Sequence, residues 1–136
     1  MRDDEFIEEV ERRTGSASPE EARRIVEATL GTLGDRLGGG ESRALASQLP
    51  RSLGDVLQAH VSEAAEGFDL EGFFERVAER AGLDPARGEP ATRAVIEVLE
   101  EAVSAGEIDD VRAALPVELH VLFRATYPPS AHPPAR

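Results

Sequence analysis

The sequence contains no cysteine, no tryptophan, no lysine and no asparagine. Without cysteine the chain can form no disulfide, no thiolate nucleophile and no cysteine-ligated metal site. Its 136 residues contain no apolar run near the roughly 20 residues that a membrane-spanning helix needs, and no start typical of a secretory signal peptide. We therefore expect a cytoplasmic protein that does not associate with the membrane.

Positive charge is also scarce, since all 15 basic residues are arginine and they are outnumbered by 27 acidic residues. The formal net charge of −12 repels nucleic acids and anionic membrane surfaces at long range. Apolar residues make up 40% of the chain and charged residues 31%, which is typical of a folded domain. The composition argues against nucleic-acid binding and favours a basic or amphipathic protein partner.

Helical patterning fills the first half of the chain. Phe6, Ile7 and Val10 recur at helical spacing, and a glycine at position 15 ends that segment. Ser18-Pro19 is a strong helix start, because serine can cap the helix and proline fits its first position. The helices expected in this half span residues 3–14, 19–37, 41–49 and 53–61.

The frame of this half returns 66 positions later in the chain. A stretch that runs from Gly38-Gly39-Gly40-Glu41 to Leu49-Pro50 is matched by one that runs from Ser104-Ala105-Gly106-Glu107 to Leu115-Pro116. In both stretches an acidic residue opens a short helix and Leu-Pro ends it. Matches at apolar positions continue across the whole unit, which indicates a duplicated helical module.

We therefore predict an all-α fold, a compact helical bundle of two pseudo-symmetric four-helix repeats. The first repeat spans residues 1–66 and the second spans residues 67–124, and together they form one domain. Residues 125–136 contain four prolines and little apolar content, so we expect a flexible, disordered tail there.

One proline breaks the match between the repeats. Pro90 falls where the second long helix is expected, and an interior proline removes a backbone hydrogen bond and clashes with the preceding turn. We predict a single turn after Asp84-Pro85 and a main helix that starts near Glu89 or Pro90, or else a kink. Gly31 and Gly34 inside the first long helix predict close approach of another helix.

The repeated frame resembles a known bacterial family. The motifs are Phe6-Ile7-Glu8-Glu9-Val10 with its following glycine, the two stretches that end in Leu-Pro, and Phe73-Phe74-Glu75-Arg76-Val77 through Gly82. They resemble the domain-of-unknown-function family 2267, and the likeness extends from Asp3 to Phe123. The resemblance implies a tandem helical repeat, and it implies no activity, cofactor or catalytic residue.

Residues with catalytic potential form no recognisable constellation. The histidines, His60, His120 and His132, lack metal-binding spacing, and the Gly38-Gly39-Gly40 turn lacks the Lys-Ser/Thr pair of a phosphate loop. Paired carboxylates such as Asp109-Asp110 are interpreted as solvated charge, with loose divalent-cation binding as the alternative. We expect no enzyme activity, no cofactor and no metal site.

Two arginines and a short proline motif are the candidate partner contacts. Arg13 and Arg80 end the first helices of the two repeats, where each can face the helix dipole or pair with a nearby acid. The alternative is that they form a pseudo-symmetric pair that binds an acidic partner. Tyr127-Pro128-Pro129 is similar to short proline ligands, but a simple unstructured end is the better interpretation of it.

The leading hypothesis is a non-enzymatic helical interaction module with an acidic surface and a setting in stress physiology. It would be a monomer or a weak homodimer. The alternative is a small-ligand carrier or sensor that uses a groove between the repeats. Phe73, Phe74 and Phe123 are the candidate lining of that groove, and their other interpretation is core packing.

Overall fold

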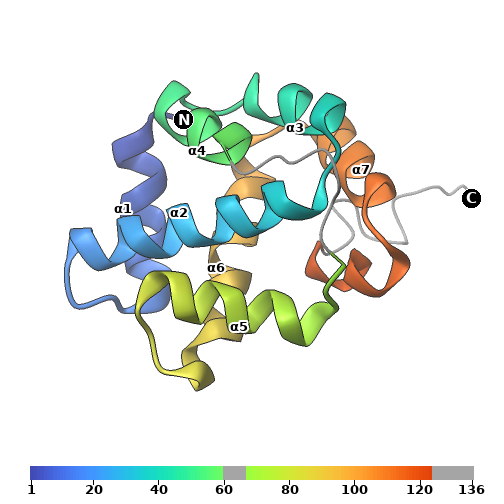
Figure 1. Cartoon of the computed structure of the whole chain (residues 1–136). Coiled ribbons are helices and arrows are strands. Elements are labelled where there is room, and N and C mark those ends of the chain that lie inside the picture. Colours follow the sequence, from blue (N-terminus) through green and yellow to red (C-terminus); the bar gives the residue numbers. More distant parts are fainter. Residues whose placement is uncertain (60–66, 124–136) are drawn as a thin grey trace, which may run out of the picture.

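The computed structural model describes residues 1–59 and 67–123, and within these ranges all regular structure is helical. The all-α prediction is therefore confirmed. The helices, shown in Figure 1, are α1 (Asp3–Thr14), α2 (Pro19–Arg36), α3 (Gly39–Ala46), α4 (Arg51–Ala59), α5 (Leu70–Ala81), α6 (Gly88–Ala102) and α7 (Ala105–Ala114), with short 3₁₀ helices η1 (Pro85–Arg87) and η2 (Val117–Leu122). The predictions for His60, His132, Tyr127-Pro128-Pro129 and the tail lie outside the described residues.

The predicted helix ends are confirmed where glycine or serine defines them. Gly15 after α1 and Gly82 after α5 have φ angles of 65° and 73°, a left-handed conformation that costs glycine little. At the start of α2, Ser18 accepts a hydrogen bond from the backbone N–H of Glu21. These caps follow directly from residue type, which is why the sequence identifies them.

The prediction around Pro90 is also confirmed. A single 3₁₀ turn follows Asp84, and α6 begins at Gly88, so Pro90 lies in the first turn, where its missing N–H leaves no bond unmade. Glycine is required at position 88 because α5 lies too close for a side chain, and not because of its dihedral freedom. A Cβ there would lie 2.3 Å from the carbonyl oxygen of Phe74.

Two elements differ from the sequence prediction. The three glycines do not form a separate turn before the short helix, because Gly38 caps α3 and the other two lie in its first turn. The last element, η2, is a 3₁₀ helix, whereas the repeat predicts an ordinary α-helix. The 3₁₀ geometry aligns residues three apart, and it buries both Leu119 and Leu122 while Val121 stays 55% exposed.

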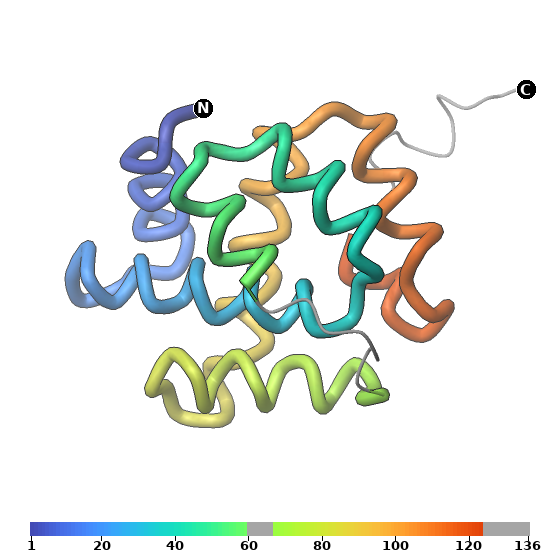
Figure 2. Tube along the Cα trace, turned by 45° about the horizontal axis from the view of Figure 1, so that its top comes forward, coloured from blue at the N-terminus to red at the C-terminus, as the bar shows by residue number. Residues whose placement is uncertain are grey.

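Helix α2 lies at the centre of the arrangement. It packs against α1, α4, α5 and α6, and it runs beside α5 while α6 crosses behind it (Figures 1 and 2). Helix α3 packs against both α4 and α7, which lie side by side with it in Figure 2. The first helix of each half also contacts the long helix of the other half, since α1 packs on α6 and α5 packs on α2.

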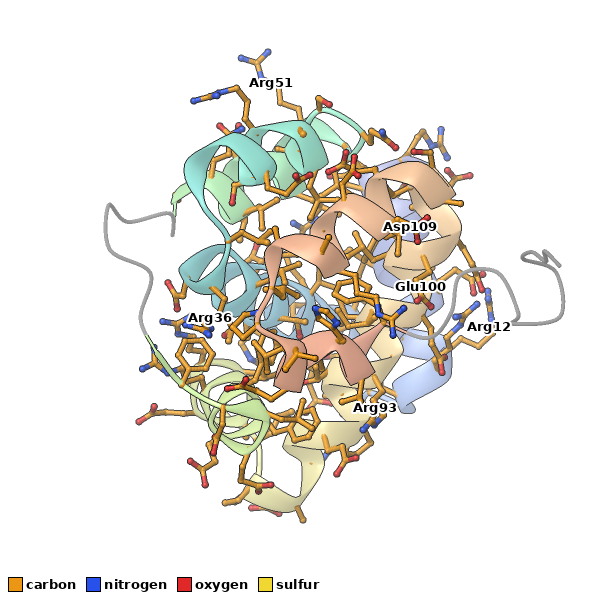
Figure 3. All side chains as sticks on the ribbon, turned by 90° about the vertical axis from the view of Figure 1, so that its right-hand side faces the viewer. Arg12, Arg36, Arg51, Arg93, Glu100 and Asp109 are labelled. Carbon is orange, nitrogen blue, oxygen red and sulfur yellow. The ribbon has the colours of Figure 1, made fainter. Side chains whose placement is uncertain are left out.

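One apolar core connects these helices. Buried side chains come from every element except η1, and Figure 3 shows them filling the space between the helices while labelled arginines such as Arg12 and Arg51 point outward. Phe6, Phe73 and Phe123 are among the largest fully buried side chains. Among the described residues no helix combines the length and apolar character needed to cross a bilayer.

Candidate functional site

An acidic groove lies between α1 and the start of α2. Its volume is about 290 Å³, and its edges carry four acidic side chains against a single arginine. Ile7 and Pro19 supply its apolar surface. The lining consists of Asp4, Ile7, Glu8, Glu11, Pro19, Glu20 and Arg23.

The charges of this groove are incompletely neutralised. Arg23 is directed toward Asp3 at 3.9 Å and Glu27 at 3.6 Å, rather than toward the acids of the groove. Among the described residues Glu8, Glu11 and Glu20 form no ion pair. The groove therefore offers a negative potential beside an apolar surface, the combination that a basic amphipathic segment complements.

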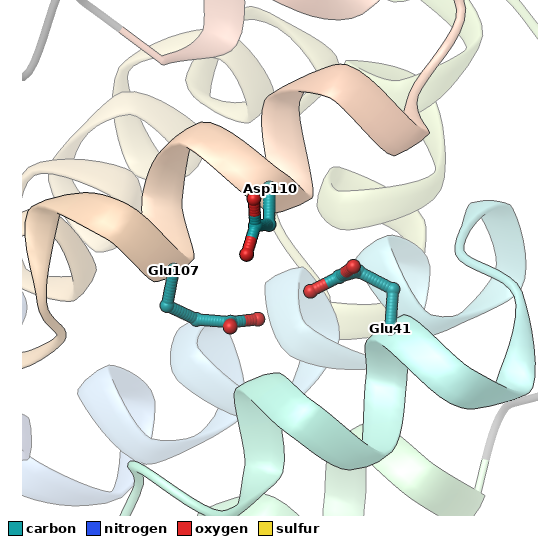
Figure 4. Close-up of side chains that lie close together, drawn as sticks. All are labelled: Glu41, Glu107 and Asp110. Carbon is teal, nitrogen blue, oxygen red and sulfur yellow. The ribbon is translucent and has the colours of Figure 1, made fainter.

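A second acidic feature lies between α3 and α7. Glu41 on α3 and Glu107 and Asp110 on α7 each place one carboxylate oxygen so that all three atoms lie within 4.8 Å of one another. Figure 4 shows the three carboxyl groups converging on one point. Glu107 is only 8% exposed, Glu41 is partly buried and Asp110 is exposed, so the cluster opens to solvent on the Asp110 side. We call these three residues the carboxylate cluster.

Local capping explains why Glu107 is free to face Glu41. Ser104 caps α7 by accepting a hydrogen bond from the Glu107 N–H, and in a capping box the glutamate would then accept from the Ser104 N–H. Here that N–H donates instead to the side-chain oxygen of Gln48 at 2.8 Å. The carboxylate of Glu107 is thereby released from its helix and directed toward α3.

The cluster changes the acidity of its buried member. Burial raises the pKa of the Glu107 carboxyl to about 7, and a hydrogen bond with Glu41 and the charges of Glu41 and Asp110 add to the effect. Among the described residues no basic side chain opposes this shift. When both glutamates are ionised, Oε2 of each is buried and has no donor in the described part of the chain.

The structure places Arg13 and Arg80 in ion pairs within the chain. Arg13 on α1 lies 2.6 Å from Glu101 of α6, and this bond raises the pKa of the guanidinium. Arg80 on α5 lies 2.8 Å from Asp35 of α2 and donates a hydrogen bond to Thr32 at 3.1 Å. Each arginine thus bridges the first helix of one half to the long helix of the other.

The phenylalanines proposed to line a groove lie in the core. Phe73 is 0% exposed, Phe74 is 6% exposed and Phe123 is 1% exposed, and none of them lines the pockets described in this structure. A larger hollow of about 460 Å³ lies elsewhere, beside Arg36, Phe68 and Glu118. Phe68 is one of its lining residues, and the guanidinium of Arg76 lies over this ring, 4.1 Å from the centroid.

Sequence reasoning missed both acidic features, although one signal was present. Glu41 and Glu107 occupy matching positions of the repeated frame, but only the packing of α3 on α7 brings them together. Within the described residues the Glu41 carboxylate accepts no hydrogen bond from the N–H groups of its own helix start, and it is directed at α7.

The remaining histidine within the described chain has a structural contact. A ring nitrogen of His120 lies 3.0 Å from the carbonyl oxygen of Leu115, next to the 3.3 Å bond from Arg112 to the His120 carbonyl. These bonds fix η2 against α7. His120 lies outside the groove and the carboxylate cluster, so it has no role in either feature.

Comparison with known proteins adds the family but no activity. A search of curated proteins finds no match to the chain. A family model described as "Uncharacterized conserved protein (DUF2267)" matches residues 3–122, which include every helix described above. The chain therefore belongs to the DUF2267 family.

Proposed function

We propose that this protein is a non-enzymatic interaction module whose acidic groove between α1 and α2 binds a basic amphipathic segment of a partner protein. The observation that carries the proposal is the meeting of unneutralised acids and apolar surface in that groove. Glu8, Glu11 and Glu20 surround Ile7 and Pro19, so basic side chains could pair at the edges while an apolar side chain contacts the floor. The net charge of −12 favours approach of such a partner.

The dimensions of the groove favour a protein segment over an enclosed small molecule. Pockets that hold drug-sized ligands are usually about 300 to 1,000 Å³ and bury most of the ligand. This groove has about 290 Å³, just below that range, which suits a few side chains of a docked helix. Its exposed charges would mainly accelerate association, so the affinity should fall as salt is added.

The wider setting of the module is part of the proposal. We place it in the cytoplasm of a bacterium, with a role in stress physiology, as a monomer or weak homodimer. We also propose that its halves are duplicated repeats. In support, Arg13 and Arg80 make equivalent bridges to Glu101 and Asp35, and those two acids are 66 positions apart in the sequence.

Charge reversal with a matched control tests the groove. The variant E8K/E11K/E20K reverses three groove acids, and E71K/E75K/E79K makes the same change in net charge on the exposed face of α5. The probe is a fluorescent helical peptide of lysine and leucine, whose affinity is measured by anisotropy at two salt concentrations. We expect the groove variant to lose binding by at least tenfold and the α5 variant to lose much less. Equal losses would show nonspecific attraction and overturn the proposal.

The partner-binding role of the two arginines is tested in the same assay with an acidic helical peptide. If Arg13 and Arg80 form a recognition pair, R13Q/R80Q will weaken binding of that peptide relative to the wild type. Their ion pairs within the chain favour the structural role, in which case the affinity will not change.

A second function is favoured by the hollow beside Phe68. Its volume of about 460 Å³ falls within the range of small-ligand sites, and it combines Arg36 with an aromatic ring. A carrier of small aromatic carboxylates would use it, with the guanidinium facing the carboxylate. Native mass spectrometry of the protein purified from its host tests this, because a carrier retains a bound small molecule whereas the interaction module retains a protein or nothing.

A further inference from the structure

We propose that Glu41, Glu107 and Asp110 form a binding site for a hard divalent cation between α3 and α7. This site is separate from the α1–α2 groove and does not depend on the proposed function. Three carboxylates from two helices supply its protein ligands, and water completes the coordination on the exposed side next to Asp110.

The spacing of the carboxylate oxygens fits the size of such a cation. Calcium binds oxygen at about 2.3 to 2.6 Å, so two of its ligands can be at most about 4.6 to 5.2 Å apart. The three oxygens of the cluster lie within 4.8 Å of one another and meet this limit as they stand. Magnesium binds oxygen at about 2.0 to 2.1 Å, which sets a stricter limit of about 4.2 Å between two of its ligands.

The buried glutamate provides an independent indication that a ligand belongs here. Glu107 is only 8% exposed, and when both glutamates are ionised its Oε2 has no hydrogen-bond donor in the described chain. Figure 4 shows this carboxyl directed at Glu41. A buried charged oxygen without a partner costs several kcal/mol in general, so a cation or a proton must compensate.

The surroundings of Glu107 favour a cation, because the neighbouring charges are negative. Gln48 takes over the capping bond that would otherwise hold Glu107 to its own helix, so the carboxylate is available as a ligand. The acidity of Glu107 responds to Glu41 and Asp110 and to no basic side chain of the described chain. Two or three like charges at this distance repel each other unless a positive ion lies between them.

The donor set selects the class of metal. All three donors are carboxylate oxygens, which suit calcium, magnesium and manganese, whereas zinc prefers nitrogen and sulfur. The nearest histidine in the described sequence, His120, bonds to Leu115 and lies outside the cluster. We therefore expect a hard cation such as Ca²⁺, Mg²⁺ or Mn²⁺ as the occupant of the site.

Occupancy would join the two halves of the chain. Helices α3 and α7 belong to different halves and already contact each other. A cation bound by Glu41 on one side and by Glu107 and Asp110 on the other would resist their separation. The consequence is a protein in which the contact between α3 and α7 is stabilised by a divalent cation.

Calorimetric titration of the chelator-treated protein tests the site. Ca²⁺, Mn²⁺ and Mg²⁺ are each titrated at pH 8 into the wild type, E107Q, D110N and the surface control E75Q. We expect one site with a dissociation constant below about 1 mM for Ca²⁺ or Mn²⁺ at pH 8. Affinity should fall at least about tenfold in E107Q and D110N, and it should be unchanged in E75Q.

Three results would overturn the proposal. They are no binding below 1 mM for any of the cations, equal losses in E75Q and E107Q, and Mn²⁺ broadening that is not centred on α3 and α7. D110N keeps the test decisive if E107Q does not fold, because Asp110 is exposed and its amide is nearly isosteric. Paramagnetic broadening by Mn²⁺ provides a second readout, which should be centred on α3 and α7.

Discussion

The buried carboxyl of Glu107 predicts that this protein becomes less stable as the pH rises through neutrality. The ordinary pKa of the group is 4.5, and in the folded chain it is raised to about 7. Between these values the unfolded chain has released the proton that the folded chain still holds, so the free energy of unfolding falls as the pH rises. The loss ends above pH 7, where the folded carboxyl ionises as well.

The magnitude follows from the shift itself. Each unit of difference in pKa corresponds to about 1.4 kcal/mol, and between pH 5 and pH 8 the expected loss is about 2.5 kcal/mol. The variant E107Q carries a neutral side chain of the same shape that can donate to Glu41. This variant should therefore lack the pH-dependent contribution of Glu107 to the free energy of unfolding. Its stability should change less between pH 5 and pH 8.

Urea unfolding followed by circular dichroism measures both proteins from pH 5 to pH 8 in the presence of chelator. The quantity of interest is the difference between wild type and E107Q at each pH, because the other titrating groups affect both proteins alike. E75Q, an exposed glutamate on α5, serves as the control and should follow the wild type. Parallel stability curves for wild type and E107Q would refute the burial argument for Glu107.

Three further predictions concern packing and ion pairs, and each is measured by urea unfolding. R80Q should destabilise the chain by about 1 to 2 kcal/mol, because it removes the ion-pair partner that lies 2.8 Å from the largely buried Asp35. R13Q should cost less than about 1 kcal/mol, because its partners Glu97 and Glu101 are half exposed. G88A should cost about 1 to 3 kcal/mol, because its Cβ would collide with the Phe74 carbonyl, and G106A, which has open space, should cost nothing. F73A should cost about 3 to 5 kcal/mol, whereas V121A, at an exposed position, should change stability by less than about 0.5 kcal/mol. Equal effects within any of these pairs would contradict the packing described for it.

Much of the fold was predictable because it depends on local chemistry. Gly15, Gly82 and Ser18 end or begin helices through conformations and hydrogen bonds that their residue types favour wherever they occur. Pro90 fixed the start of α6 for the same reason. The 3₁₀ form of η2 was not predictable from the repeat, because its preference comes from burying Leu119 and Leu122 against other helices.

The candidate sites were harder to predict because they depend on contacts between distant helices. Glu41 and Glu107 were identified as matching residues, but their approach requires α3 to pack on α7 and Gln48 to cap across 56 residues. The groove acids look like ordinary solvated charge in the sequence. Their placement around Ile7 emerges only when α1 lies against the start of α2.

The proposal that the acidic groove binds a basic segment is tested most directly by NMR. Backbone amide signals of ¹⁵N-labelled protein are followed while the lysine-leucine peptide is added at physiological salt. The account predicts that the largest shifts map to α1 and the first turns of α2, around Ile7 and Glu20, and that they disappear in E8K/E11K/E20K. Shifts spread evenly over the acidic surface, or centred on α5, would contradict it.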